Sequence, residues 1–207
     1  MADSADSTPQ VSGRIIRGLR VIPLNADQAP FELTVYRGDY IVFRPAGFGP
    51  DPILAIPRLD VSQPLDEPGE SPPYFKMKTP GAYDFTLGPT RGRIRVLTYR
   101  HPSYHEISAA QAAQRIAQGS PLILDVRTPQ EFQQGHIAGA RLLPVQELQH
   151  RFGELQQYKQ EEILIYCATG NRSTVAAKIL ADQGFENLTN LRGGVREWLR
   201  ENHPLQR

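Results

Sequence analysis

Apolar and polar residues alternate in the first half of the chain with the period of β-strands. In residues 31–36, F-E-L-T-V-Y, the first, third and fifth side chains are apolar, which is typical of a strand with one buried face. Similar runs are separated by turn sequences such as R-G-D and P-A-G-F-G-P; they include L-R-V-I-P-L, Y-I-V-F, I-L-A-I, Y-D-F-T-L and R-I-R-V-L-T-Y. No helical pattern of useful length precedes Pro102. We therefore predict a disordered tail over residues 1–12 and an all-β sandwich over residues 13–100.

The pattern changes after Pro102, where strand-like and helix-like segments alternate. The runs P-L-I-L-D-V, E-I-L-I-Y and N-L-T-N-L predict buried strands. Capping sequences and helical periodicity predict helices from Ser108 to Gly119, from Thr128 onward, from Arg172 to Asp182 and from Gly194 to Glu201. This alternation indicates an α/β domain over residues 107–207, with a parallel sheet between helices, preceded by a linker over residues 101–106.

Composition narrows the range of functions. The chain of 207 residues has a net charge of +1 and no long apolar run, so we expect no general affinity for nucleic acid and no membrane span. Residues 1–10 lack the basic and apolar regions of a secretory signal, which leads us to expect a cytoplasmic protein. The single cysteine, Cys167, excludes an intramolecular disulfide, a CxxC redox pair and a multi-cysteine zinc site. We expect no metal and no cofactor.

The segment around Cys167 has the arrangement of an anion site. A buried strand runs into the short loop C-A-T-G-N-R-S, and a helix is predicted directly after it. Ligands bind at such carboxyl ends of parallel strands. Gly170 tolerates a left-handed conformation, and a tight loop of this kind can turn successive main-chain N–H groups inward. The N-terminus of the following helix and the charge of Arg172 add to the attraction for an anion.

A cysteine at the mouth of such a loop is favoured as the thiolate. Cys167 is therefore the predicted nucleophile, and it needs no separate general base. The same N–H groups are expected to hold the outer sulfur of a persulfide; the predicted binding residues are Ala168, Thr169, Gly170, Asn171 and Arg172. An inert buried cysteine at a strand end is the alternative interpretation, and the order strand, Cys, Gly, Arg, helix favours the nucleophile.

Four motifs resemble, in order, those of the single-domain rhodaneses, which are sulfurtransferases. They are L-D-V-R-T-P-Q-E-F (124–132), G-H-I-A-G-A (135–140), C-A-T-G-N-R-S (167–173) and L-R-G-G-V-R-E-W (191–198). The resemblance covers residues 106–204 and implies a parallel sheet between helices with the catalytic cysteine at the start of the loop. It also implies a ping-pong reaction, in which a Cys167 persulfide carries a sulfane sulfur from a small donor such as thiosulfate to a thiol or cyanide acceptor.

The length of the loop separates this chemistry from phosphate chemistry. Residues 168–171 lie between Cys167 and Arg172, whereas cysteine-dependent phosphatases have one more residue there and a wider ring. The missing second cysteine counts against arsenate reduction through an internal disulfide. A rhodanese-fold phosphatase or an arsenate reductase is therefore the weaker alternative. The other alternative is a relay module whose Cys167 takes sulfur only from a protein partner.

The remaining motif residues are expected to support the loop. The resemblance implies that Asp125 and Arg127 brace loops through hydrogen bonds and ion pairs. For His136 a structural hydrogen bond is favoured over proton transfer. The two glycines of L-R-G-G are expected to permit a tight turn before the last helix. Arg172 either steers an anionic donor or braces the loop, and the sequence leaves both roles open.

The first half of the chain resembles a cupredoxin sandwich from Arg20 to Thr98. The resemblance is carried by F-E-L-T-V-Y-R-G-D-Y-I-V-F, K-T-P-G-A-Y-D-F-T-L and R-G-R-I-R-V. A type 1 copper site needs two histidines and a cysteine, but this half has no cysteine and its first histidine is His101. We therefore predict a cupredoxin-like domain that binds no copper and that docks a protein partner, covers the active site or stabilises the chain, with a docking or structural role favoured.

Overall fold

The structure, a computed structural model, describes residues 10–65, 73–119 and 121–207. The chain forms two compact units. The first contains the described residues of the ranges 1–14, 20–37 and 41–98, and the second contains residues 15–19, 38–40 and the described residues from 99 to 207. Residues 1–9 of the predicted tail lie outside the described residues, and Ser12 at its end donates its main-chain N–H to the carbonyl oxygen of Thr34 at 2.7 Å.

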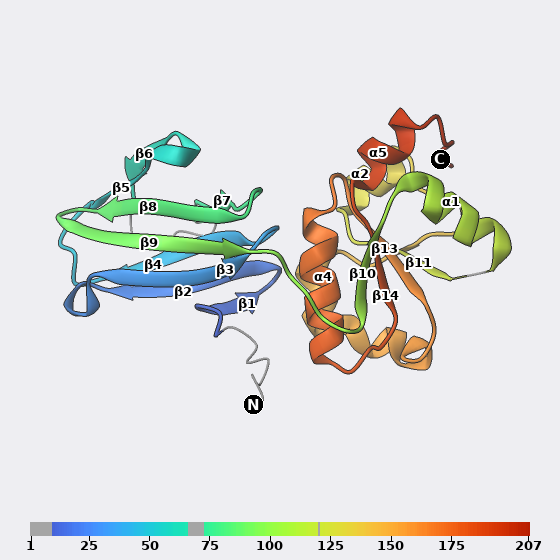
Figure 1. The fold of residues 1–207 in the computed structure, drawn as a ribbon, viewed down its shortest axis with the longest axis horizontal. Coiled ribbons are helices and arrows are strands. Elements are labelled where there is room, and N and C mark those ends of the chain that lie inside the picture. Colours follow the sequence, from blue (N-terminus) through green and yellow to red (C-terminus); the bar gives the residue numbers. More distant parts are fainter. Residues whose placement is uncertain (1–9, 66–72, 120) are drawn as a thin grey trace, which may run out of the picture. The chain divides into compact units, whose positions relative to one another are not determined.

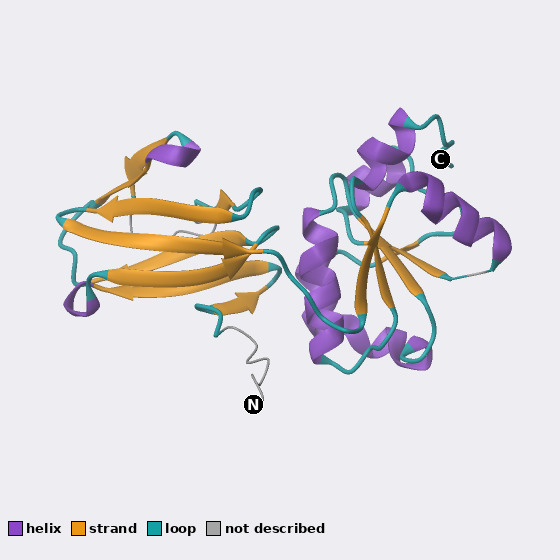
Figure 2. Cartoon of the chain, viewed as in Figure 1, coloured by secondary structure: helices purple, strands orange, loops and turns teal. Residues whose placement is uncertain are grey.

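The first half of the chain is rich in strands (Figures 1 and 2). Its strands are β1 Arg14–Ile16, β2 Leu19–Asn25, β3 Phe31–Tyr36, β4 Tyr40–Ala46, β5 Ile53–Ile56, β6 Val61–Pro64, β7 Phe75–Lys76, β8 Gly81–Leu87 and β9 Thr90–Leu97. They form one sheet in the order β1-β2-β4-β7 and another in the order β3-β9-β8-β5-β6. Each strand predicted here from the apolar runs is present, whereas the likeness to cupredoxins stays a prediction.

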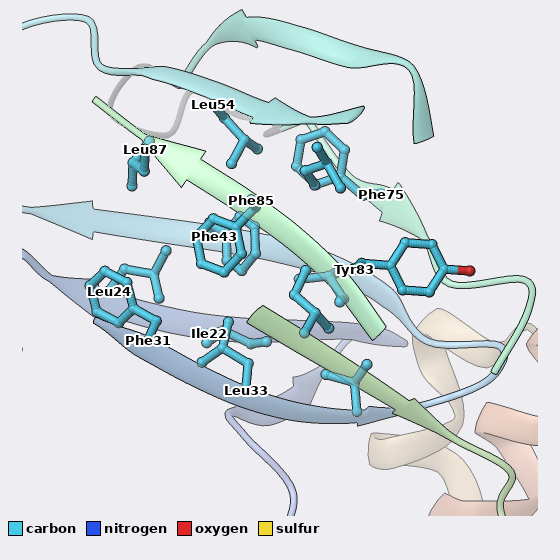
Figure 3. Packing of buried hydrophobic residues seen from close by; sticks show 14 of the residues in the cluster. Ile22, Leu24, Phe31, Leu33, Phe43, Leu54, Phe75, Tyr83, Phe85 and Leu87 are labelled. Carbon is cyan, nitrogen blue, oxygen red and sulfur yellow. The ribbon is translucent and has the colours of Figure 1, made fainter. Parts of the chain in front are cut away.

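Alternation along these strands builds a single hydrophobic core. Phe31, Leu33 and Val35 are all buried, as predicted from their spacing. They pack in one cluster with side chains from the other sheet, including Ile22 and Phe43 (Figure 3). The two sheets therefore share a core, which is the arrangement expected when each sheet has one apolar face.

The second half is an α/β domain around five parallel strands. Its elements are β10 Tyr104–Ile107, α1 Ala109–Gln118, β11 Leu122–Asp125, α2 Pro129–Gln133, β12 Arg141–Leu142, α3 Val145–Arg151, β13 Ile163–Tyr166, α4 Asn171–Asp182, β14 Leu188–Leu191 and α5 Gly194–Arg200. The strand order is β10-β14-β13-β11-β12, and every pairing is parallel. This confirms the predicted parallel sheet.

Helices cover both faces of this sheet (Figure 2). Ile163 and Ile165 of β13 pack in a cluster with residues of α3 and α4. Leu164 and Tyr166, which point to the opposite face, pack with residues of α1 and α5. A strand covered on both faces reads as a continuous apolar run, which is why I-L-I-Y carries no alternation.

The start of this domain differs from the prediction. Residues 104–106, which we predict as part of a linker, lie in β10, and this strand pairs with β14 along its full length. Tyr104 and Ile107 are buried while His105 is exposed. The segment Y-H-E-I was misread because it is short, lacks strict alternation and follows Pro102.

Two helix starts follow the predicted capping chemistry. Ser108 and Thr128 each accept a hydrogen bond from the main-chain N–H three residues later, and the side chains of Gln111 and Glu131 accept one in return. Sequence reasoning did not identify α3 or β12. Across the described ranges, no helix combines the length and apolar character needed to cross a membrane.

Candidate active site

Cys167 follows the last residue of β13, at the carboxyl edge of the parallel sheet. Its neighbour Tyr166 is the register partner of Asp125, the last residue of β11, so the ends of two central strands meet here. Cys167 as a whole residue is 1% exposed. Ser173 Oγ donates a hydrogen bond to Cys167 Sγ at 3.5 Å, which places a side-chain donor against the sulfur.

The loop after Cys167 turns at Gly170 and leads directly into α4. Gly170 has a φ of +86°, which confirms the predicted left-handed conformation. A Cβ atom at this position would overlap the carbonyl oxygen of Arg192, so backbone conformation and close packing both require glycine. No side chain caps α4.

The main-chain N–H groups of residues 168–173 are unpaired. Among the residues that the structure describes, none of these groups donates a hydrogen bond. Unpaired N–H groups in a row at a helix N-terminus form a ready site for an anion. This arrangement supports the binding role predicted for residues 168–172.

Two carbonyl groups at the start of the same loop accept hydrogen bonds from the main chain of α5. The oxygen of Cys167 accepts from the N–H of Val195 at 2.8 Å, and the oxygen of Ala168 accepts from the N–H of Arg196 at 3.2 Å. In a trans peptide the C=O and N–H point in opposite directions. The N–H groups of Ala168 and Thr169 therefore point away from α5.

A second anchor holds the next turn of the loop. The carbonyl oxygen of Gly170 accepts hydrogen bonds from Thr174 N at 3.2 Å, from Thr174 Oγ1 at 2.8 Å and from Asn190 Nδ2 at 3.3 Å. By the same trans geometry, the N–H of Asn171 points away from these donors. Two neighbouring elements, α5 and β14, thus orient the loop amides.

Gly194 permits the approach of α5. Its φ is +59°, and a Cβ atom there would overlap the carbonyl oxygen of Cys167 and lie within 2.7 Å of the Thr169 nitrogen. A Cβ atom at Gly193 would instead meet the side chain of Glu197. The predicted tight turn is present, and it brings the donors of α5 onto the loop.

Arg172 points to a carboxylate outside the loop. Its two terminal nitrogens donate to Glu131 Oε2 at 2.7 Å and Oε1 at 2.6 Å. This hydrogen-bonded pair lowers the pKa of Glu131 to about 2 and raises the pKa of Arg172 above its ordinary value. Of the two roles left open by the sequence, the geometry supports bracing.

Asp125 and Arg127 form a buried ion pair. The guanidinium donates to both carboxylate oxygens, with Arg127 Nη2 to Asp125 Oδ2 at 2.6 Å, and also to the carbonyl oxygen of Gly135 at 2.8 Å. Asp125 is fully buried and Arg127 is 5% exposed. The pair thus ties the end of β11 to the segment after α2, a bracing arrangement.

His136 is engaged in local structure. Its Nδ1 lies 3.2 Å from the carbonyl oxygen of Phe132, and its ring stacks on that of Phe132 with 3.8 Å between centroids. Its main chain exchanges two hydrogen bonds with Gln206. These contacts support the structural role over proton transfer.

Three residues at the site were not identified from the sequence: Glu131, Ser173 and Asn190. Glu131 had been assigned only to a helix cap. Asn190 is fully buried in β14 and also donates to Tyr104 Oη at 2.9 Å; its Oδ1 is the buried side-chain atom left without a partner among the described residues. A polar residue inside the apolar run N-L-T-N-L was the available signal.

No metal site is evident in the part of the chain described here. Within it, no group of three or more His, Cys, Asp or Glu residues is arranged to hold an ion.

Comparison with known proteins matches the second half of the chain. The family described as "Rhodanese-like domain" matches residues 108–201. A "Sulfurtransferase" of Allochromatium vinosum is 37% identical over 102 residues, which are 49% of this chain and 94% of that protein. The "Uncharacterized protein YibN" of Escherichia coli strain K12 is 31% identical over 102 residues, which are 49% of this chain and 71% of that protein.

Solved structures match the same half. A rhodanese-related protein from Thermoplasma volcanium is 31% identical, and the match covers 50% of this chain and 98% of that chain with a TM-score of 0.45. The sequence relatives carry the assignment, because one of them is matched over nearly its full length. Through its second half, the chain belongs to the rhodanese-like family.

Proposed function

We propose that the protein is a sulfurtransferase in which Cys167 carries a sulfane sulfur as a persulfide. The single observation that carries this proposal is the row of unpaired main-chain N–H groups over residues 168–173, directly after Cys167. The name of the relative from Allochromatium vinosum supports sulfur transfer for the family.

The reaction has two steps. In the first, the Cys167 thiolate attacks the outer sulfur of the donor, a new S–S bond forms, and the donor's S–S or S–sulfonate bond breaks with its electron pair going to the leaving group. With thiosulfate the leaving group is sulfite. In the second step a thiol or cyanide attacks the outer sulfur of the persulfide, and the Cys167 thiolate leaves.

The loop amides serve both steps. A negative outer sulfur needs donors around it, and N–H groups already fixed in place stabilise it without rearrangement. The hydrogen bonds that α5 and Asn190 donate to the carbonyl oxygens of residues 167, 168 and 170 supply that fixed orientation. Because Cys167 is only 1% exposed, small donors are expected to reach its thiol faster than bulky ones.

Intact-protein mass spectrometry tests the proposal. After treatment with thiosulfate or a small hydropersulfide, we expect one added sulfur of about 32 Da that cyanide removes. The variant Cys167→Ser is the control and should gain no sulfur while keeping its circular dichroism spectrum. Unchanged loading in Cys167→Ser, or no loading of the folded wild type by either donor, would overturn the proposal.

A partner-dependent relay is the second candidate. Here Cys167 accepts sulfur only from a protein, and the β-rich first half supplies recognition. The burial of Cys167 favours small donors over a protein donor, so this candidate requires that small donors fail to load the cysteine. Slow loading by both small donors, together with fast loading from a persulfidated protein, would select it.

A phosphatase is tested in the same experiment series. The loop with residues 168–171 between Cys167 and Arg172 suits a single sulfur atom better than a phosphoryl group. Hydrolysis of an aryl phosphate, lost in Cys167→Ser, would contradict the sulfurtransferase assignment.

A further inference from the structure

Arg172 is the one charged residue in the loop C-A-T-G-N-R-S. Its guanidinium is held by both oxygens of Glu131 at 2.7 and 2.6 Å. The two side chains are 17% and 30% exposed, so this pair is partly shielded from water. The only cation that the loop itself carries is therefore matched by a carboxylate.

Both partners are ionised near neutral pH. The hydrogen bonds from Arg172 lower the pKa of Glu131 to about 2, and the carboxylate raises the pKa of Arg172. The pair therefore sums to zero charge. Arg127, at the adjacent strand end, is likewise matched by Asp125 at 2.6 Å.

What the loop offers a ligand is then a set of neutral N–H dipoles. Such a set suits one negative sulfur atom. Thiosulfate carries a second negative charge on its sulfonate oxygens, and this group needs a cation or water when it enters a protein site. A hydropersulfide with an uncharged R group, R–S–SH or R–S–S⁻, carries at most one charge, located on the sulfur that is transferred.

We propose that Glu131 is a specificity-determining residue that cancels the charge of Arg172 and thereby favours hydropersulfide donors over thiosulfate. The inference rests on the proposed sulfur transfer at Cys167. In the favoured reaction, the Cys167 thiolate attacks the outer sulfur of R–S–SH. The new S–S bond forms, the donor S–S bond breaks, RS⁻ leaves, and the proton stays on the outer sulfur or passes to water.

The test measures rate constants for sulfur loading of Cys167 with two donors, a small alkyl hydropersulfide without other charged groups and thiosulfate. The key variant is Glu131→Gln, since glutamine also serves at the third position of a capping box and the start of α2 is preserved. Freeing the Arg172 charge should shift the ratio of the two rate constants toward thiosulfate by about fivefold, as expected for one partly screened unit charge. Arg172→Ala should shift the ratio in the opposite direction.

The matched control is Glu154→Gln. Glu154 forms ion pairs with Arg151 and Arg141, each at 2.6 Å, and all three side chains are more than a third exposed. This change alters the total charge by the same amount and should leave the donor ratio unchanged. The exposed residues Arg192 and Arg196 could also attract thiosulfate, but they are the same in every variant. A change in the ratio of rate constants therefore reports the charge at position 131.

The outcomes separate the inference from the proposed function. A ratio that stays constant in Glu131→Gln and Arg172→Ala, while both variants still load sulfur, would overturn the role of Glu131 and leave sulfur transfer intact. Absence of loading in folded wild-type protein with both donors would overturn sulfur transfer itself. Opposite shifts in the two variants, with Glu154→Gln unchanged, support the inference.

Discussion

Gly194 lies so close to Cys167 that a Cβ atom at position 194 would overlap the cysteine's carbonyl oxygen. This contact places the first turn of α5 on the active-site loop, where the N–H of Val195 binds the same oxygen at 2.8 Å. The position of a helix that contributes no reacting atom thus determines the direction of the loop amides.

Gly194→Ala should displace the loop and lower sulfur loading at Cys167 at least tenfold, a loss of about 1.4 kcal/mol or more. It should also destabilise the domain, because alanine at a positive φ costs about 1–2 kcal/mol even without overlap. Urea unfolding and mass spectrometry measure the two effects. Gly139→Ala is the control, since Gly139 has a φ of +78° and nothing within 4 Å of an added Cβ atom. Equal loading in both variants would contradict the role of the α5 contact.

Asp125→Asn should destabilise the second domain by about 3 kcal/mol, because it leaves the buried charge of Arg127 without its partner. Trp198, the single tryptophan of the chain, is 5% exposed in the core of this domain, so its fluorescence reports unfolding of this half. The control Glu147→Gln breaks an exposed pair with Arg151 in the same half of the chain and should change the free energy of unfolding very little. A small effect of Asp125→Asn would show that the buried pair is not a brace.

The ion pair of Glu131 with Arg172 should make the stability of the folded protein depend on pH in the acid range. Because the folded pKa of Glu131 is lowered to about 2, the ionised carboxylate binds protons less readily in the folded protein than in the unfolded chain. Its contribution is fully present above the unfolded glutamate pKa of about 4.3 and is lost as the pH falls through about 2.

Acid titrations of wild type and Glu131→Gln measure this contribution. Wild type should be the more stable above about pH 5, and the difference should shrink continuously toward pH 2. Trp198 fluorescence during urea unfolding at each pH gives the free energies. If the difference in free energy of unfolding between wild type and Glu131→Gln stays constant across this range, the substitution acts through the shape of the side chain and not through its charge.

Asn190→Ala should loosen the loop without touching Cys167. The substitution removes one of the three donors to Gly170 O and the donor to Tyr104 Oη. The loss of these two buried hydrogen bonds should cost about 1–3 kcal/mol. Amide hydrogen exchange over residues 168–173 should become faster, together with slower sulfur loading. The matched control is Asn187→Ala, at an exposed position just before β14. Identical exchange in both variants would contradict the anchoring role.

Local patterns were sufficient to predict much of this domain. Cys167, Gly170 and the start of α4 lie within a few residues of one another, so their arrangement follows from backbone conformation and helix capping. The two capping boxes were predicted for the same reason, because each joins residues three apart. The parallel sheet followed from the alternation of apolar runs with helical segments.

The features that the sequence did not reveal depend on contacts between segments far apart in the chain. Glu131 and Arg172 are 41 residues apart, and nothing in either motif indicates that they meet. Asn190 reaches Gly170 only because β14 is the neighbour of β13 in the sheet. The strand β10 was misread as a linker because its burial comes from pairing with β14, which no local pattern reveals.

The anchors of the loop carbonyls have a consequence for synthesis of the protein. Val195 and Arg196 are translated well after Cys167, yet their N–H groups hold the carbonyl oxygens of residues 167 and 168. A nascent chain on the ribosome that has not yet exposed these residues carries a cysteine whose loop lacks two of its anchors. The active-site loop therefore reaches its final arrangement only after α5 has emerged and folded, so the proposed sulfur loading of Cys167 should depend on completion of the whole domain.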